Sequence, residues 1–327
     1  MNVFVTGGAG YIGSHTVRLL LEAGHRVMVY DNLSEGHAAA VPAGLLVRGD
    51  LADLATLGQA LRSEPFDAVV HFAANCYVGE SMVDPEKYYY NNVVNSLNML
   101  RAMKAAEVKR IVFSSSAATY GDPIESPITE THPQSPINVY GRTKLHFEQI
   151  LGDYARAHQI GFAALRYVNA AGAAPDAALG EDHDPETHLV PVVLQAALGL
   201  RENVAIFGND YETPDGTCVR DYIHIYDLAQ AHILALEAIK PGEARAYNLG
   251  NGQGYSVRQV IQTAERVTGK KIAVAESPRR PGDPAVLVAS SEKIIRELGW
   301  KPRYPALESI IETAWKWHNS HPEGYGE

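Results

Sequence analysis

A tyrosine and a lysine lie four residues apart in the run Tyr140-Gly141-Arg142-Thr143-Lys144. On a helix, residues four apart project from the same face and can contact each other. An ammonium group beside a phenol stabilises the phenolate, so it lowers the phenol pKa from about 10 toward neutral pH. The pair therefore predicts that Tyr140 is a general base, although the same spacing also occurs in ordinary amphipathic helices.

A glycine-rich loop near the start of the chain gives the second chemical signal. The run Gly7-Gly8-Ala9-Gly10-Tyr11-Ile12-Gly13 satisfies both G-x-x-G-x-x-G and G-x-G-x-x-G, between an expected strand and an expected helix. Such glycines allow a tight turn and a close approach to a pyrophosphate, whose charge the helix N-terminus stabilises. Asp31, 18 residues after Gly13, can accept a hydrogen bond from a ribose 2′-hydroxyl and would repel a 2′-phosphate. The loop predicts a dinucleotide site that prefers NAD to NADP, and with Tyr140 it indicates redox chemistry on a bound nicotinamide.

Two weaker signals extend this site. Asp50-Leu51 follows a third expected strand and is a candidate adenine contact, with a solvated loop as the alternative. Ser114-Ser115-Ser116 lies at the carboxyl end of another expected strand, which is where α/β sheets bind their ligands. A serine there can hydrogen-bond a substrate hydroxyl alongside Tyr140, although serines after strands are usually turn residues. With Tyr140 and Lys144 it completes a Ser, Tyr, Lys set.

The elements that must position these residues follow an alternating pattern. Short, apolar, β-rich runs alternate with segments of helical spacing, which predicts an α/β fold with a Rossmann-type, doubly wound parallel sheet. The runs expected to be strands are residues 3–5, 26–30, 68–72, 110–114 and 162–168, and the segments expected to be helices are residues 12–23, 55–63, 92–106 and 144–158.

The pattern changes after about Asn169. Residues 170–184 are rich in Ala, Gly, Pro and Asp, as in a loop or crossover. We therefore expect residues 1–169 to form the nucleotide-binding domain and residues 170–327 a second, smaller α/β domain. Residues 220–250, with an expected strand at 246–249, are expected to return to the first sheet.

Composition limits the classes of partner. The 327 residues are 46% hydrophobic and carry a formal net charge of -10, which argues against nucleic acid because phosphates are bound by clustered Lys and Arg. The two cysteines, Cys76 and Cys218, form no C-x-x-C or zinc spacing, and this favours a reducing compartment. No apolar run approaches the ~18 residues of a membrane helix. We expect a cytoplasmic protein without a membrane partner.

Taken together, these residues resemble the extended branch of the short-chain dehydrogenase/reductase superfamily, and within it the family of epimerases that interconvert UDP-glucose and UDP-galactose. The resemblance covers essentially the whole chain. The motifs that carry it are residues 5–15, 71–74, 140–144, 166–169, 205–211, 219–224 and 247–250. The first two are common to the superfamily, and the later ones are specific to the epimerases.

The resemblance implies a reversible inversion at sugar carbon 4, in galactose metabolism, through a 4-keto intermediate and with retained NAD. Tyr140 would take the 4-hydroxyl proton, Ser116 would orient that oxygen, and Lys144 would hold the nicotinamide ribose. The implied cofactor contacts are Gly7, Gly10, Tyr11, Ile12, Gly13, Asp31, Asn32, Asp50, Leu51, Phe72, Ala73, Ala74, Asn92, Ser114, Tyr140, Lys144 and Tyr167. The implied UDP-sugar contacts are Ser116, Tyr140, Asn169, His188, Leu189, Ala205, Ile206, Phe207, Arg220, Arg280 and Asp283.

Three departures from related patterns modify these expectations. Cys76 stands where some epimerases carry a lysine near the pyrophosphate, so NAD could be held less tightly. Ala117 and Ala118 stand where the related 4,6-dehydratases carry an Asp and a Glu, and alanine can be neither acid nor base. Leu287 replaces a bulkier tyrosine of some members. We therefore expect no dehydratase activity and some activity on UDP-N-acetylhexosamines.

Other readings remain open. The acidic and histidine-rich segment 181–188 has the composition of a metal site, but we expect it to be a substrate-covering loop without metal because NAD carries the implied chemistry. A non-catalytic nucleotide sensor, another UDP-sugar epimerase and a net dehydrogenase are the alternatives in function. A homodimer through the helices at 92–106 and 144–154 is expected by resemblance alone.

Overall fold

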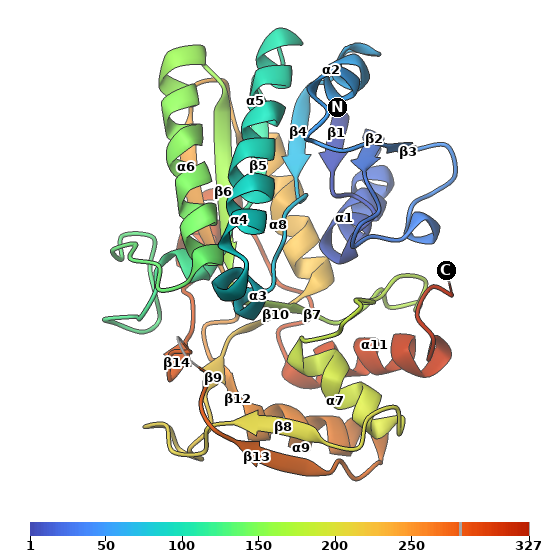
Figure 1. The fold of residues 1–327 in the computed structure, drawn as a ribbon, viewed down its shortest axis with the longest axis vertical. Helices are drawn as coiled ribbons and strands as arrows, with labels where there is room; N and C mark the ends of the chain where they lie inside the picture. Colours follow the sequence, from blue (N-terminus) through green and yellow to red (C-terminus); the bar gives the residue numbers. More distant parts are fainter. Residues whose placement is uncertain (281–282, 327) are drawn as a thin grey trace.

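The computed structural model describes residues 1–280 and 283–326. Its main feature is a seven-stranded sheet in the order β11-β6-β5-β4-β1-β2-β3, in which all neighbouring strands are parallel (Figure 1). The strands are β1 Asn2–Thr6, β2 Arg26–Asp31, β3 Leu46–Arg48, β4 Ala68–His71, β5 Arg110–Ser114, β6 Gly161–Tyr167 and β11 Ala244–Leu249.

Helices cover both faces of this sheet. The longer ones are α1 Tyr11–Glu22, α2 Leu54–Arg62, α5 Ser96–Ala105, α6 Val139–His158 and α8 Ile225–Ala238. Strand side chains alternate between the two faces. Val3 and Val5 pack in the core with α1 and α8, whereas Phe4 packs in the core with α2, α5 and α6. Figure 1 shows α5 and α6 in front of the sheet and α8 behind it. The predicted doubly wound Rossmann-type sheet is confirmed.

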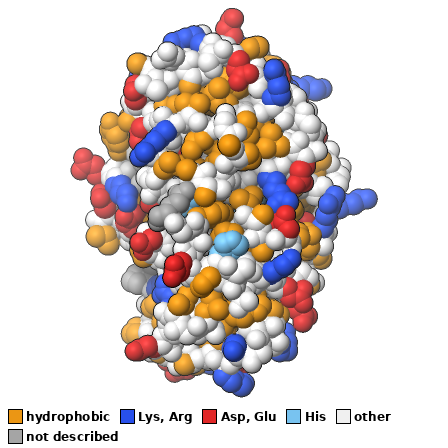
Figure 2. Space-filling view, turned by 90° about the vertical axis from the view of Figure 1, so that its right-hand side faces the viewer, with side chains coloured by type: hydrophobic (Ala, Val, Ile, Leu, Met, Phe, Trp, Pro, Cys, Tyr) orange, Lys and Arg blue, Asp and Glu red, His pale blue; other side chains and the backbone are white. Residues whose placement is uncertain are grey.

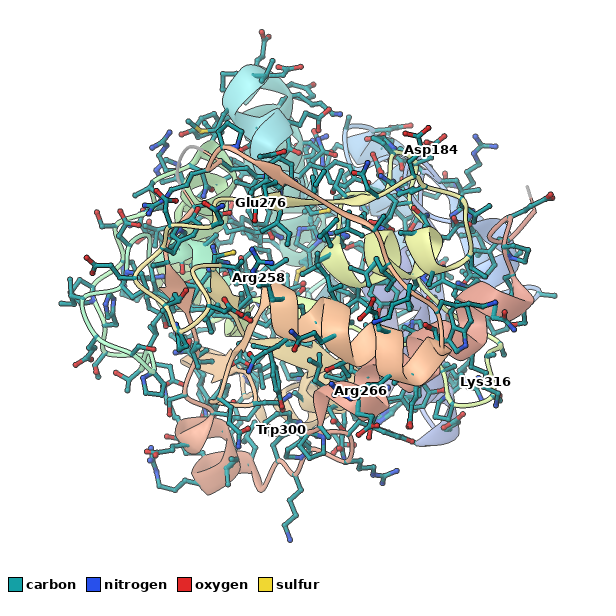
Figure 3. All side chains as sticks on the ribbon, turned by 90° about the horizontal axis from the view of Figure 1, so that it is seen from below. Asp184, Arg258, Arg266, Glu276, Trp300 and Lys316 are labelled. Carbon is teal, nitrogen blue, oxygen red and sulfur yellow. The ribbon has the colours of Figure 1, made fainter. Side chains whose placement is uncertain are left out.

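The second part of the chain forms a smaller α/β unit below the sheet (Figure 1). Its elements are β7 Asn169–Ala171, α7 Leu189–Ala197, β8 Val204–Phe207, β9 Val219–Arg220, β10 Tyr222–His224, β12 Tyr255–Ser256, α9 Val257–Thr268, β13 Val274–Ser277, β14 Val286–Leu287 and α11 Leu307–Ser320. Apolar side chains of α7, β8, α9 and α11 form one core. Figure 3 shows α9 lying across this end of the molecule, with Arg258 on it and Glu276 on β13, and these two side chains form an ion pair of 3.0 Å.

Several boundaries differ from those expected. The helix expected at 144–158 begins at Val139, because the Asn138 side chain accepts a hydrogen bond from the Gly141 backbone N–H and so caps it. The helix expected at 92–106 begins as a π-helix, η2 Tyr90–Asn95, before α5. The segment expected to be a loop from residue 170 instead begins in β7, which pairs with β10.

The remaining short elements connect these layers. They are η1 Ala38–Ala40, α3 Val78–Val83, α4 Pro85–Tyr89, η3 Ala117–Thr119 and α10 Glu292–Leu298. Among the described residues, no helix is both long and apolar enough to span a membrane. On the face seen in Figure 2, acidic and basic side chains are interspersed.

Candidate active site

The glycine loop between β1 and α1 is closed by contacts that leave no room for a side chain. A Cβ on Gly13 would lie 2.1 Å from the Gly7 carbonyl oxygen, and a Cβ on Gly7 would lie 2.5 Å from the Ala73 backbone nitrogen. Gly7 also has a φ of +69°, which favours glycine. Gly10 precedes α1 without a capping side chain from the described residues, so the first N–H groups of α1 remain to bind an anion.

A cleft runs from this loop past the ends of β2 and β4. Nine residues predicted to contact the cofactor line it: Gly7, Gly10, Asp31, Asn32, Asp50, Leu51, Phe72, Ala73 and Ala74. The cleft is also lined by residues that sequence reasoning missed: Tyr30, Ser34, Glu35, Gly36, Gly49, Asn75 and Asn91. Asn75 directly follows the His71–Ala74 motif, so its proximity was available as a signal. The others belong to no motif: Tyr30 lies in β2, Asn91 lies in η2, and the rest lie in loops.

Backbone contacts fix Asp31 at the end of β2. Its carboxylate accepts hydrogen bonds from the backbone N–H groups of Ala9 and Leu33, at 2.9 and 2.8 Å. Burial raises the pKa of Asp31, and these two bonds oppose that rise. Each oxygen of the Asp31 carboxylate can still accept a further hydrogen bond, for example from a ribose hydroxyl. Beside it, Asn32 donates to the Asp50 carboxylate at 2.8 Å, which ties two predicted adenosine contacts together.

The predicted Ser, Tyr, Lys set comes together at the carboxyl end of β5 and the start of α6. Lys144 is buried, and its Nζ donates to the Ser114 carbonyl oxygen at 2.9 Å. The same Nζ lies 5.6 Å from the centre of the Tyr140 ring. Ser116 follows β5 and lies near enough to Tyr140 for its hydroxyl to oppose the rise in the phenol pKa that burial causes. The structure thus juxtaposes all three side chains.

The ionisation of Tyr140 differs from the expectation. We expected Lys144 to lower the phenol pKa, but burial is the largest influence and raises that pKa above its ordinary value. Burial also lowers the pKa of Lys144 to about 8, so its ammonium group remains mostly charged at pH 7. Ser116 is the group that opposes the rise. In the protein alone Tyr140 is therefore a neutral phenol at pH 7, and forming its phenolate requires additional positive charge nearby.

The remaining predicted cofactor residues lie in neighbouring elements, and most of them make hydrogen bonds that fix their positions. Ser114 and Tyr167 join through their hydroxyls at 2.5 Å. Asn92, in the π-helix, accepts from the Asn75 N–H at 2.8 Å and donates to the Thr143 hydroxyl at 3.1 Å. It therefore connects the cleft to α6. Tyr11 and Ile12 lie in the first turn of α1, and the Tyr11 hydroxyl donates to the Gly172 carbonyl at 2.7 Å.

The predicted UDP-sugar contacts come from the second unit. Arg220 forms an ion pair with Asp283, so these two predicted residues lie in direct contact. The Arg280 guanidinium lies 3.9 Å from the centre of the Phe207 ring. Phe207 belongs to β8, as do Ala205 and Ile206, so Arg280 packs against the end of this strand. Asn169 begins β7, the strand that continues from β6 toward the second unit.

The two predicted contacts of α7 have separate surroundings. His188 precedes α7 and Leu189 is its first residue. The His188 Nδ1 lies 2.8 Å from the Glu181 carboxylate, in a cluster of acidic and imidazole groups. The structure therefore ties the His188 ring to this cluster.

The three departures from related patterns also lie near the site. Ala117 is buried directly after Ser116, and Leu287 packs against it together with Tyr120. Leu287 pairs with Arg220 in the β14–β9 ladder, so it lies between the reacting end and the arginines. Cys76 is half-buried and free.

Comparison with known proteins gives consistent matches. Residues 3–250 match the model of the NAD dependent epimerase/dehydratase family. The chain is 53% identical to a UDP-glucose 4-epimerase of Halalkalibacterium halodurans over 99% of this chain and 98% of the relative. A crystal structure of a UDP-glucose 4-epimerase matches with a TM-score of 0.96 and 48% identity, covering 100% of both chains. The enzyme of Bifidobacterium longum in complex with NAD+ and UDP matches at 0.95 and 39%, covering 99% and 100%.

Proposed function

The chain belongs to the NAD dependent epimerase/dehydratase family and, within it, to the UDP-glucose 4-epimerases, and we propose how its own residues carry out the reaction. The reaction is the reversible interconversion of UDP-galactose and UDP-glucose at sugar carbon 4, with NAD as cofactor. The observation that carries the residue assignment is the proximity of Ser116 and Lys144 to Tyr140 at the carboxyl end of β5 and the start of α6.

The residues of the cleft fit NAD. The space that a Cβ on Gly7 or Gly13 would fill is occupied by backbone, and the first turn of α1 offers N–H groups to a pyrophosphate. Asp31 retains acceptor capacity for a ribose. When bound, NAD supplies a hydride acceptor and donor, and its oxidised nicotinamide carries a positive charge. In this proposal residues 1–169, with α8 and β11 of the segment 220–250, form the NAD-binding domain. The rest of residues 170–327, Arg220 included, bind the UDP-sugar.

Tyr140 is the general base for the 4-hydroxyl proton and returns a proton to the same oxygen in the reverse direction. Ser116 orients that oxygen, because its hydroxyl lies beside the Tyr140 phenol. Lys144, fixed by the Ser114 carbonyl, binds the nicotinamide ribose through its remaining donors. The oxidised sugar then turns over in the site while the UDP group stays bound.

The nucleotide diphosphate is bound by the second unit. Arg220 and Arg280 each offer a planar fork of donors to phosphate oxygens. Asp283 holds the Arg220 fork in place, and Phe207 holds that of Arg280. The backbone of residues 205–207, together with Asn169, His188 and Leu189, completes the uridine side of this proposed pocket.

The proposal is tested by incubating the purified protein with UDP-galactose and no added nicotinamide, and resolving the uridine sugars by chromatography. Formation of UDP-glucose to a constant ratio, with no net NADH, supports it. Conversion only with added NAD would indicate a loosely held cofactor beside Cys76. Net NADH in proportion to product would instead indicate a dehydrogenase, and no conversion under either condition would contradict the proposal.

A wider substrate range is our second proposal for this site. Leu287 packs beside Ala117, one residue from Ser116, and a leucine leaves more space than a tyrosine. We expect UDP-N-acetylglucosamine to be epimerised measurably. Leu287→Tyr should abolish that activity and leave the turnover of UDP-galactose within about threefold, because only the 2-substituent is crowded. No epimerisation of UDP-N-acetylglucosamine by the unsubstituted protein would contradict the assignment.

We also propose a cytoplasmic homodimer. Both cysteines are free, as in a reducing compartment. The π-helix η2, which leads into α5, has two exposed apolar side chains: Val94 is 46% exposed and Tyr90 is 56% exposed. Val94→Asp should shift the mass measured by light scattering from dimer to monomer, because it buries a charge at the interface. Ile124→Asp, at another exposed apolar side chain, is the control and should leave the mass unchanged. A monomeric parent protein would refute the dimer.

A further inference from the structure

Four side chains outside the Ser, Tyr, Lys set converge in the segment that leads into α7. Each of Glu181, His183, Glu186 and His188 offers one ligand-type atom, and these atoms lie within 4.8 Å of one another. The carboxylate side chains are 4% and 3% exposed and the His183 side chain is 10% exposed. Two buried acids and the nearly buried imidazole of His183 therefore share one small space with the imidazole of His188, whose side chain is 38% exposed.

Three of the four distances between the imidazole and carboxylate groups of this cluster are long for hydrogen bonds. His183 Nδ1 lies 3.5 Å from Glu181 Oε1 and 3.4 Å from Glu186 Oε2. His188 Nδ1 lies 2.8 Å from Glu181 Oε1 and 3.4 Å from Glu186 Oε1. Among the described residues neither Nδ1 has a partner in hydrogen-bonding geometry. Buried polar atoms are rarely left in this state without a reason.

A tetrahedral cation accounts for this geometry. Zinc binds imidazole nitrogen and carboxylate oxygen at about 2.0–2.2 Å, and a tetrahedron with such bonds separates its ligand atoms by about 3.3–3.6 Å. Three of the four distances above fall in that interval, although the two to Glu186 involve different carboxylate oxygens. The set of ligand atoms spreads over up to 4.8 Å, so the side chains must draw together around the ion. The 2.8 Å contact requires a small movement of His188. Two carboxylates also balance the charge of a dication.

We propose that Glu181, His183, Glu186 and His188 form a zinc site, which reverses the expectation from the sequence that this segment binds no metal. Four protein ligands leave no open position, so the site is structural rather than catalytic. An ion-pair network between protonated histidines and the two glutamates is the competing arrangement, and it would keep the same charge balance.

The surroundings indicate what the ion would stabilise. The rings of Tyr11, in α1, and Tyr77, before α3, pack against His183 with centre-to-centre distances of 6.3 and 6.2 Å. Arg201 donates to the Glu186 carbonyl at 2.9 Å. Figure 3 shows Asp184, in the middle of the segment, at the edge of the molecule. The ion would therefore fix residues 181–188 between the first turn of α1 and α7.

The test measures metal, not activity. The full-length protein is stripped with a chelator, incubated with zinc chloride, passed through gel filtration and assayed for zinc by mass spectrometry. We expect close to one zinc per chain, and a melting temperature that rises with the zinc concentration. His183→Asn should lose the bound zinc. His25→Asn is the matched control, because His25 contacts a single carboxylate, Glu237 at 3.2 Å, and should retain zinc at the parent level.

Two results would overturn the zinc site. One is a folded parent protein, with a cooperative melting transition, that retains no zinc. The other is a His183→Asn variant that retains as much zinc as the parent. If His183→Asn does not fold, the parent loaded with Co²⁺ decides instead. Intense visible absorption, typical of tetrahedral Co²⁺, supports the site, and the weak absorption of octahedral Co²⁺ contradicts it.

Discussion

At the scale of single residues, the ionisation of Tyr140 determines whether the site can work. Burial raises the pKa of the phenol, and Lys144 is itself buried with a pKa lowered to about 8. Ser116 is the protein group that opposes the rise. The sequence predicted that these three residues act together, and the structure brings them together. The sequence did not predict the effect of burial on the phenol pKa, because a four-residue spacing indicates proximity and not desolvation.

Replacement of Tyr140 tests its role as the base. Tyr140→Phe should lower kcat by about 10²–10⁴-fold, the usual contribution of general acid–base catalysis, while NAD content stays at the parent level. Tyr154→Phe, on the same helix and away from the cleft, is the matched control and should leave kcat unchanged. Steady-state rates with UDP-galactose and the NAD content of each purified variant give the comparison. An unchanged kcat for Tyr140→Phe would remove it from the base role.

At the scale of elements, the sheet and the glycine loop were predictable for physical reasons. Central parallel strands such as β5 are buried on both faces, so they appear as short continuous apolar runs. The loop was recognisable because its close approaches exclude all other residues. The start of α6 was missed, since the expected helix began at Lys144 and its cap is the single side chain of Asn138. The π-helix at 90–95 has no composition that distinguishes it from an α-helix.

The glycine loop gives a prediction at this scale. Gly13→Ala would place its Cβ 2.1 Å from the Gly7 carbonyl oxygen, so the loop must shift, at a cost of about 1–3 kcal/mol in the free energy of unfolding. The bound NAD should also be lost. Gly152→Ala, within α6, has its nearest neighbour at 3.9 Å and should be neutral or slightly stabilising. Thermal melting and NAD content of both variants provide the measurement, and a Gly13→Ala protein with parental NAD content would contradict the loop's role.

At the scale of the whole molecule, the pairing of distant segments was the part least accessible from the sequence. Arg166 lies in a motif that we recognised, yet its role emerges only in the fold. On β6, it forms a buried ion pair with Glu148 of α6, whose carboxylate also accepts from Ser115. This network holds the helix of Tyr140 against the sheet. The segment 181–188 had the composition of a metal site, but its composition could not show that the four side chains converge.

Buried neutral histidines on both sides of the sheet give the molecule a pH-dependent stability. Burial lowers the pKa of His71 to about 3 and that of His232 to about 4. The unfolded chain, with an ordinary histidine pKa, binds more protons than the native protein in this range. Their contribution to stability is therefore complete above about pH 6.5 and is lost progressively as the pH falls toward 4.

Denaturant unfolding at a series of pH values measures this dependence. His232→Gln should reduce the slope of the free energy of unfolding between about pH 6 and 4.5 by up to about 1.4 kcal/mol per pH unit, the contribution of one proton. His146→Gln, at an exposed histidine, is the control and should leave the slope unchanged. An equal slope in His232→Gln and the parent protein would contradict the neutral state of His232.

The most direct test of the central claim uses UDP-galactose labelled with deuterium at sugar carbon 4. The purified protein is incubated with this substrate in ordinary water without added nicotinamide, and the UDP-glucose formed is analysed by mass spectrometry. A site in which Tyr140 handles only the hydroxyl proton, and the carbon-bound hydrogen returns to the same sugar, predicts UDP-glucose that retains the deuterium. Loss of the deuterium to water would contradict that account.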